Sequence, residues 1–157
     1  MIPGMEMGPF PSRFACGELR VVIAASEASR RRSLGESLEE EGFVVCASED
    51  DAAGAVEATV REEPDACLVA DDLAGSALVA TGKIATAAPR SKVVILSASI
   101  DEEDCLKYLL VGASGYVCGD TDRPDLADAV RAVVSGRAVV PPQAQRRLLE
   151  ELREQLL

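Results

Sequence analysis

The stretch PDACLVADDLAGSALVATGKIATAAPRSKVVILS, residues 64–97, contains two short apolar runs separated by a segment of helical length. The runs, ACLVA at 66–70 and KVVILS at 92–97, are typical of strands that are buried on both faces. The segment between them, SALVATGKIATAAP at 76–89, has the length of a helix and is rich in Ala. Because parallel neighbouring strands need a crossover connection, which a helix supplies, this stretch predicts a strand–helix–strand unit of a parallel sheet.

The same rhythm extends to both sides of this unit. Strand and helix pairs follow one another at residues 20–42, 43–64, 66–89, 92–112 and 115–136. Five such pairs predict an α/β fold, a doubly wound five-stranded parallel sheet with helices on both faces.

Residues typical of helix ends agree with the bounds of these predicted helices. Gly42 follows the first helix, Asp101 precedes an acidic first turn in the fourth, and Pro124 suits the first turn of the fifth.

The two ends of the chain differ from this core. Residues 1–18 carry three Pro and three Gly without periodicity, which predicts a flexible leader before a domain at 19–142. Residues 143–157 predict an amphipathic helix, because Leu148, Leu149, Leu152 and Leu156 recur at helical spacing. Such a helix can pack on its own domain, or it can serve as a linker or dimerisation helix. We expect the chain to be the first part of a longer protein.

The composition excludes several classes of function. The net charge of −11 repels a phosphate backbone, so we expect no nucleic-acid contact by this segment. The chain has no His, and its five Cys form no CxxC pair, which argues against a zinc site or a catalytic dyad. We expect reduced core cysteines, no catalytic residue and no metal, in a cytoplasmic protein. Neither a signal peptide nor a membrane span is indicated, because no run of 18 apolar residues exists.

Five motifs, in order and at fitting separations, resemble the receiver domains of bacterial response regulators. They are LRVVIAAS at 19–26, PDACLVADDLAG at 64–75, VVILSAS at 93–99, GASGYVCGD at 112–120 and LADAVRAVVSGRAVVPP at 126–142. The last of them resembles the NarL/FixJ (LuxR-type) class of transcription factors. The resemblance implies a flavodoxin-like sheet of order 2-1-3-4-5, with five helices plus a C-terminal extension helix. It also implies a role in two-component signal transduction, or phosphorelay.

The same resemblance implies a phosphorylation pocket at the carboxyl ends of the strands, where open parallel sheets bind their ligands. In the family, two acidic residues after the first strand bind Mg²⁺, and an Asp at the end of the third strand accepts the phosphoryl group. A Ser or Thr at the end of the fourth strand and a Lys after the fifth hold the phosphoryl oxygens. The cation is needed because the nucleophile and the incoming group are both anionic.

This sequence departs from the family at most of those positions. The acidic pair falls on Ala25 and Ser26. Counting five residues on from Asp65 places the acceptor position at Ala70, and the Lys position falls on Gly119. The resemblance therefore implies a degenerate pocket, as in a pseudo-receiver.

The remaining polar residues leave alternatives open. Ser97 keeps the hydroxyl of the family, although a Ser at a strand end also bonds its own backbone. Tyr116 matches the aromatic switch position, or it fills a gap under the fourth helix. Asp71 offers a displaced phosphoacceptor, with Glu27 or Asp72 as metal ligands, and Mg²⁺ is expected only in that case. Alternatively, Asp71 and Asp72 form a solvated loop that caps the third helix.

Three functional hypotheses follow. The first is a phosphorylation-independent receiver that signals and dimerises as the N-terminal part of a helix-turn-helix transcriptional regulator. Its partners would be a second copy and a histidine kinase or other signalling protein, with DNA bound by the C-terminal domain. The second is a ligand-sensing domain, because Ala and Gly leave a roomier, less charged site. The third is a phosphoaccepting receiver that uses Asp71.

Overall fold

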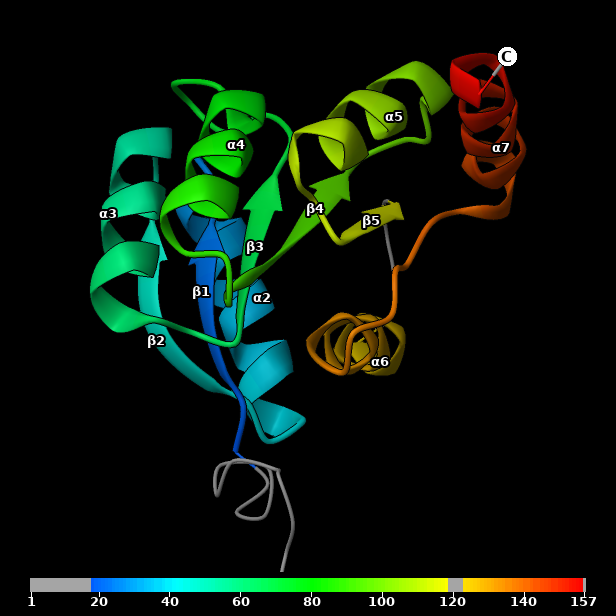
Figure 1. Ribbon diagram of the computed structural model, residues 1–157. Helices are drawn as coiled ribbons and strands as arrows, with labels where there is room; N and C mark the ends of the chain where they lie inside the picture. Colours follow the sequence, from blue (N-terminus) through cyan, green and yellow to red (C-terminus); the bar gives the residue numbers. More distant parts are fainter. Residues whose placement is uncertain (1–17, 119–122, 157) are drawn as a thin grey trace, which may run out of the picture.

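The computed structural model of the 157-residue chain describes residues 18–118 and 123–156. Its strands are β1 Arg20–Ala24, β2 Val44–Glu49, β3 Ala66–Ala70, β4 Lys92–Ser97 and β5 Gly115–Cys118. Its helices are α2 Ala28–Glu40, α3 Ala52–Glu62, α4 Ala77–Ala87, α5 Glu102–Val111, α6 Arg123–Val134 and α7 Pro142–Leu156. The strands are parallel and lie in the order β2-β1-β3-β4-β5 (Figure 1). This confirms the predicted five-stranded sheet and the strand order that the family resemblance implied.

Helices cover both faces of the sheet, because successive side chains of each strand point to opposite sides. One face packs against α3, α4 and α5, mainly through small residues such as Ala55, Ala58 and Ala80. The other face packs against α2 and α6, where the contacts come from Leu38, Leu126, Val130 and Val133. Fully buried strand residues such as Ile23 and Leu68 each contribute roughly 1.5–3 kcal/mol through their burial. The sheet is therefore a rigid base for the loops at its edges.

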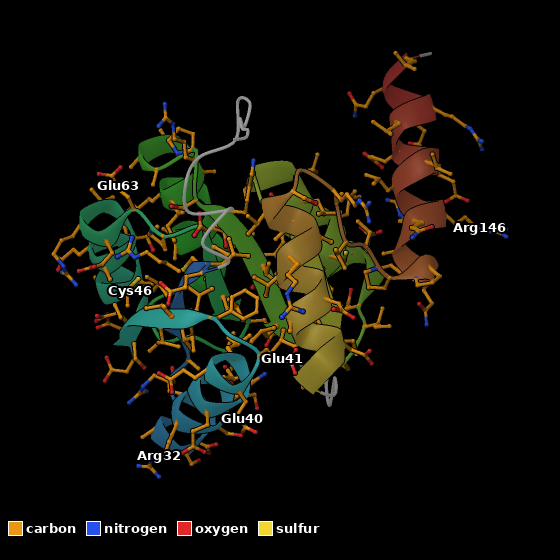
Figure 2. The ribbon with its side chains drawn as sticks, turned by 90° about the horizontal axis from the view of Figure 1, so that it is seen from below. Arg32, Glu40, Glu41, Cys46, Glu63 and Arg146 are labelled. Atoms are coloured by element: carbon orange, nitrogen blue, oxygen red, sulfur yellow. The ribbon has the colours of Figure 1, made fainter. Side chains whose placement is uncertain are left out.

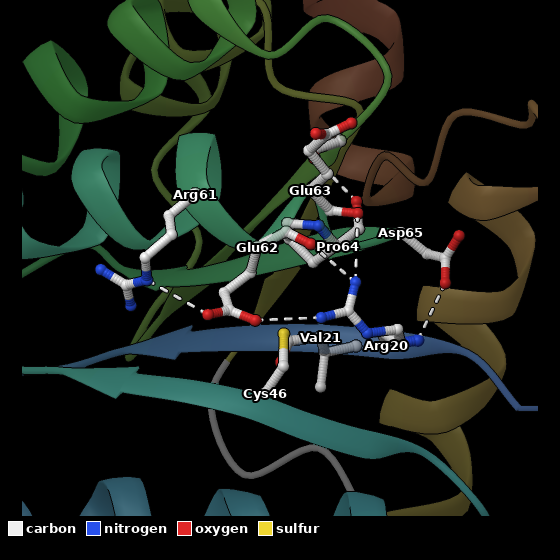
Figure 3. Close-up of polar contacts among 9 residues, drawn as sticks. Arg20, Val21, Cys46, Arg61, Glu62, Glu63, Pro64 and Asp65 are labelled. Carbon is white, nitrogen blue, oxygen red and sulfur yellow. Dashed lines mark hydrogen bonds and ion pairs between the residues drawn. The ribbon is translucent and has the colours of Figure 1, made fainter.

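A polar cluster fixes β1 against β3 at the amino ends of the strands (Figure 3). The backbone N–H of Arg20 donates to Asp65 Oδ2 at 2.8 Å. The guanidinium of Arg20 donates to the Glu62 carbonyl at 2.6 Å and pairs with the Glu62 carboxylate at 3.1 Å. Asp65 is almost fully buried, so this pairing holds the start of β3 in one register. The register in turn determines which residue stands at the far end of β3.

The expected helix signals are present. Gly42 follows α2 with a φ of 94°, a left-handed conformation that glycine adopts without strain. The Asp101 carboxylate accepts a hydrogen bond from the Asp104 N–H at 3.1 Å and so caps α5, whose first turn is acidic. Pro124 is the second residue of α6. Sequence patterns of this local kind are reliable because they depend on only a few neighbouring residues.

The last helix, α7, packs on its own domain through one face only. Ala144 is buried, and the Arg147 guanidinium donates to the Glu103 carboxylate of α5 at 2.7 Å. Leu149 and Leu152, which share the helix with Ala144, are each 51% exposed. The predicted packing of this segment on its own domain is therefore observed, whereas its role as a linker or dimerisation helix stays a prediction. With 15 residues α7 is the longest described helix, and no helix in 18–118 or 123–156 could cross a membrane.

The described cysteines are core residues or lie near the core. Cys67 and Cys105 are fully buried, and burial raises the pKa of the Cys67 thiol to about 12. Cys46 and Cys118 are partly buried in strands at the two edges of the sheet. Cys16 lies outside the described residues. A thiol with a raised pKa is largely protonated at neutral pH and therefore unreactive, which agrees with the expected core role of Cys67.

Candidate functional site

The carboxyl ends of four strands meet at one edge of the sheet. Strand pairing places Ala24 beside Val69, Ala70 beside Leu96, and Ser97 beside Cys118. The loops that follow these strands therefore converge, as expected for a ligand site in an open parallel sheet. Gly119, which follows β5, lies outside the described residues.

The two positions that would carry metal-binding carboxylates hold a methyl group and a hydroxyl. Ala25 is 1% exposed, and its N–H donates to the Glu49 carbonyl at 3.1 Å. Ser26 Oγ accepts a hydrogen bond from the Ala74 N–H at 2.9 Å and lies 3.4 Å from the Asp50 carbonyl. The Ser26 hydroxyl thus joins the loops after β1, β2 and β3.

A cation of the protein lies at the same loop. The Arg31 guanidinium, on α2, donates to the Ala25 carbonyl at 2.7 Å and to the Ser26 carbonyl at 3.0 Å. A guanidinium carries its charge at every physiological pH. Arg31 therefore places a guanidinium beside the two positions that lack carboxylates. The sequence prediction missed this residue, although the run of three Arg at 30–32 was a visible signal.

The acceptor position itself is filled by a methyl group. Ala70 is the last residue of β3 and is fully buried. Its carbonyl accepts a hydrogen bond from the Leu73 N–H at 3.1 Å, and this turn leads the chain away from the sheet. Ala70 has no atom that could attack a phosphoryl donor.

The next residue, Asp71, reaches the hydroxyl of Ser97. Its N–H donates to the Leu96 carbonyl at 2.9 Å, and its Oδ2 lies 2.8 Å from Ser97 Oγ. Ser97 is 3% exposed, and its Oγ also lies 2.6 Å from the Ser99 carbonyl. A hydroxyl has one proton, so Ser97 donates to one of these two oxygens at a time. Ser97 thereby links the end of β3 to the loop between β4 and α5, and Ser99 is a second contact that the sequence did not indicate.

The other two candidate carboxylates point elsewhere. The Asp72 side chain is 71% exposed and lies 3.9 Å from the Arg30 guanidinium. Glu27 accepts a hydrogen bond from Ser29 Oγ at 3.2 Å. Within residues 18–118 and 123–156, no three His, Cys, Asp or Glu side chains lie close enough together to hold a metal ion.

The predicted cap on the third helix was wrong. The helix concerned is α4, and Ser76 caps it, because Ser76 Oγ accepts a hydrogen bond from the Val79 N–H at 3.1 Å. Asp71 and Asp72 lie too far before the first helical residue, Ala77, to reach its free N–H groups. The loop between them turns through Gly75 and Ser76, which both have positive φ. A Cβ on Gly75 would lie 3.2 Å from the Ala52 side chain, so this turn is tightly packed.

Tyr116, at the aromatic switch position, is a core residue. It is 1% exposed, and its ring lies against Tyr108 of α5 with a centroid distance of 6.1 Å. Burial raises the pKa of Tyr116, as does the negative charge of Asp71, while a hydrogen bond with Ser97 acts in the opposite direction. Burial, together with Asp71, raises the pKa of Tyr108 to about 12. The ring fills the space under α5, as one of the two predicted interpretations proposed.

These pKa shifts predict how stability changes at alkaline pH. A tyrosine whose pKa is raised on folding keeps its proton to a higher pH in the native state than in the unfolded state. Its full contribution to the free energy of unfolding is therefore present below the unfolded pKa of 10.0. Stability is then lost as the pH rises from about 10 through about 12. Tyrosinate absorbance measures this directly, because the chain has two Tyr and no Trp. We expect a midpoint clearly above 10 in the folded domain. A midpoint that is the same with and without denaturant would contradict these surroundings.

Comparison with known proteins agrees with this geometry. The family model of the response regulator receiver domain matches residues 21–131. The transcriptional regulatory protein DegU of Brevibacillus brevis is 32% identical over 112 residues, which are 71% of this chain and 48% of DegU. The oxygen regulatory protein NreC of Staphylococcus epidermidis is 30% identical over 138 residues, which are 85% of this chain and 62% of NreC. The chain therefore spans less than two thirds of the length of these relatives.

Solved structures support the same family. A two-component response regulator of the LuxR family from Aurantimonas sp. SI85-9A1 matches with a TM-score of 0.77 and 25% identity, over 85% of this chain and 97% of that one. The receiver domain of the putative response regulator NarL from Mycobacterium tuberculosis matches with a TM-score of 0.73 and 23% identity, over 76% of this chain and 98% of that one. The family model spans all five strands, apart from Arg20 at the start of β1, and ends within α6. The likeness therefore rests on the sheet that builds the site. The chain belongs to the response regulator receiver domain family, with relatives of the NarL and DegU type.

Proposed function

We propose that this receiver domain works without phosphorylation, as a signalling and dimerisation module whose site is held together by its own side chains. The observation that carries the proposal is the 2.8 Å hydrogen bond between Ser97 Oγ and Asp71 Oδ2. In the family a hydroxyl at this position binds a phosphoryl oxygen. Here the carboxylate of Asp71 accepts a hydrogen bond from that hydroxyl. The switch position is thereby occupied without any transferred group.

Two further observations support the proposal. Ala25 and Ala70 provide no carboxylate for a metal or for phosphoryl transfer, and both are buried. The Arg31 guanidinium bonds the carbonyls of Ala25 and Ser26, in the loop after β1. This loop is therefore held by contacts from within the chain.

The proposal extends to the whole protein. Because the curated relatives are longer and include a transcriptional regulatory protein, we propose that this chain is the N-terminal part of a helix-turn-helix transcriptional regulator. DNA would then be bound by the C-terminal domain and not by the acidic receiver. The partners would be a second copy of the chain and a histidine kinase or other signalling protein in the cytoplasm. The receiver itself would regulate and would not catalyse.

One observation favours a second candidate function. Asp71 lies one residue after the acceptor position and reaches the pocket hydroxyl, so it is the side chain best placed to accept a phosphoryl group instead. Phosphoryl transfer to Asp71 would require a metal, and Glu27 and Asp72 are turned toward Ser29 and Arg30. We therefore favour the phosphorylation-independent function.

Beryllofluoride with Mg²⁺, which mimics a bound phosphoryl group, tests the proposal without a covalent step. A ligand that binds only the native state must raise its stability, so a functional pocket would show an increased Tm. We expect no change in Tm and no change in sedimentation for this chain, and a clear increase for a phosphoaccepting relative treated in parallel. An increase in Tm that requires both reagents and is lost in Asp71→Asn would establish the second candidate.

A further inference from the structure

The large apolar side chains that remain exposed fall mainly into two groups. One group is a row on α7, the α7 stripe, made of Leu149, Leu152 and Leu156, which are 51%, 51% and 86% exposed. The other group lies around α3, α4 and the end of α5, and includes Val60, Val79 and Val111. Surfaces of this kind mark sites of interaction when they are contiguous and bordered by polar residues.

Val79 and Val111 of the second group line a groove beside α3 and α4, here called the α3–α4 groove. It consists of two adjoining hollows of about 510 and 680 Å³ that share Val56, Val79 and Lys83. Gly82 provides the room, because a Cβ on Gly82 would meet nothing nearer than Val111 at 3.9 Å. The groove is therefore a mostly apolar depression beside two helices, a shape that accepts the apolar face of a third helix.

The α7 stripe is not used in the packing of α7 on its own domain. The contact with α5 is made by Ala144 and Arg147, and Arg147 also pairs with Glu151 at 2.9 Å. In helical projection, Leu149, Leu152 and Leu156 lie on a different face from Ala144 and Arg147. The stripe therefore remains available while α7 is docked.

The α7 stripe and the α3–α4 groove of one chain lie at opposite ends of the molecule. Along one side the helices follow in the order α3, α4, α5 and α7, each in contact with the next. Figures 1 and 2, seen from directions 90° apart, both place α7 at the end away from α3. A docked α7 thus cannot fill the groove of its own chain, so a second copy is the source of a matching helix.

The charges beside the two surfaces are complementary on the α3 side of the groove, whereas Lys83 lies on its α4 side. Arg146 and Arg153 flank the α7 stripe about 10.5 Å apart along the helix, given a rise of about 1.5 Å per residue. Arg146 projects away from the domain (Figure 2). On the α3 side of the groove, Asp51 and Glu57 line the rim about 9 Å apart along the helix axis. In a chain with a net charge of −11, two arginines beside an apolar row form a surface suited to an acidic rim.

We propose that the α7 stripe of one copy docks in the α3–α4 groove of a second copy, with Arg146 and Arg153 facing Asp51 and Glu57. This inference rests on the self-association in the proposed function and names the surface responsible. Two copies related by a two-fold axis form the contact twice and close as a dimer. The row of leucines fills the depression above Gly82, and the charges fix the direction of the helix.

Sedimentation of three single variants, measured over a concentration series, tests this contact. Leu152→Glu changes the stripe, Val79→Glu changes the groove, and Val44→Glu changes a 39% exposed side chain on β2 outside both surfaces. Each of the first two variants removes an apolar side chain from the contact and places a carboxylate there, which should raise the dimer Kd about 100-fold, whereas the control should leave it unchanged. Gly82→Leu, which fills the groove without adding charge and raises helix propensity, should weaken the dimer as well.

Mixing the two monomeric variants distinguishes this contact from others. In a mixture of Leu152→Glu and Val79→Glu, one of the two contacts joins an intact stripe to an intact groove, while the other joins the two altered surfaces. A dimer weaker than the wild-type dimer should therefore return in the mixture. If Leu152→Glu dissociates the dimer and mixing restores nothing, α7 pairs with α7 and the groove assignment is wrong. A dimer that persists in both variants would show that another surface mediates self-association. A monomeric wild-type chain would contradict both this docking surface and the self-association in the proposed function.

Discussion

The triple variant Ala25→Asp, Ala70→Asp, Gly119→Lys is expected to accept one phosphoryl group per chain from acetyl phosphate and Mg²⁺, a reaction that we do not expect of the wild-type chain. The three changes restore the metal-binding carboxylate, the nucleophile and the ammonium at the positions that match the family. The strand register already places residues 25 and 70 at the same edge of the sheet as Ser97. Intact-protein mass measures the result, and the matched variant with Ala70→Asn should gain no mass.

The same triple variant should depend on Mg²⁺ for its stability. Ala25 and Ala70 are almost fully buried, so the two new carboxylates lie in a desolvated place close to Asp71. Without a cation their repulsion and desolvation should lower the free energy of unfolding by several kcal/mol. Added Mg²⁺ should restore much of this loss in the variant and change nothing in the wild-type chain. A variant that is equally stable with and without Mg²⁺ and gains no phosphoryl mass would show that restoring these three side chains does not rebuild the phosphorylation pocket.

Tyr116→Ala is expected to lower the free energy of unfolding by about 3–5 kcal/mol, because it leaves a large cavity beneath α5. Tyr116 is among the largest fully buried side chains, and its ring packs against Tyr108. The matched control Tyr116→Phe keeps the ring and removes the hydroxyl, so it should cost about 1 kcal/mol. Urea unfolding measures both values. A small loss in Tyr116→Ala would mean that the ring is not fixed in the core and moves as a switch.

Much of the fold could be predicted because its signals are local and repeated. The apolar runs at 20–25 and 66–70 became β1 and β3 almost residue for residue, since a strand buried on both faces tolerates little but small and β-branched side chains. Gly42 and Asp101 marked helix ends for reasons that involve only the adjacent turn. The strand order came from the family resemblance, because no local pattern determines which strands are neighbours.

The site was less predictable, because it depends on contacts between distant segments. Nothing near Asp71 in the sequence indicates that its carboxylate meets Ser97, 26 residues later. The Arg31 contact depends on how the first turn of α2 folds back over the end of β1. The wrong prediction that Asp71 and Asp72 cap the third helix has the same origin, since Gly75 and Ser76 insert a turn that shifts the helix start.

The central claim is that resident side chains have replaced the phosphoryl group, and the intact-protein mass of the wild-type chain after incubation with acetyl phosphate and Mg²⁺ tests it most directly. Asp71 is bonded to Ser97 and the acceptor position is Ala70, so the account predicts an unmodified mass at every incubation time. An added mass of one phosphoryl group that disappears in Asp71→Asn would contradict the account and identify Asp71 as a working phosphoacceptor.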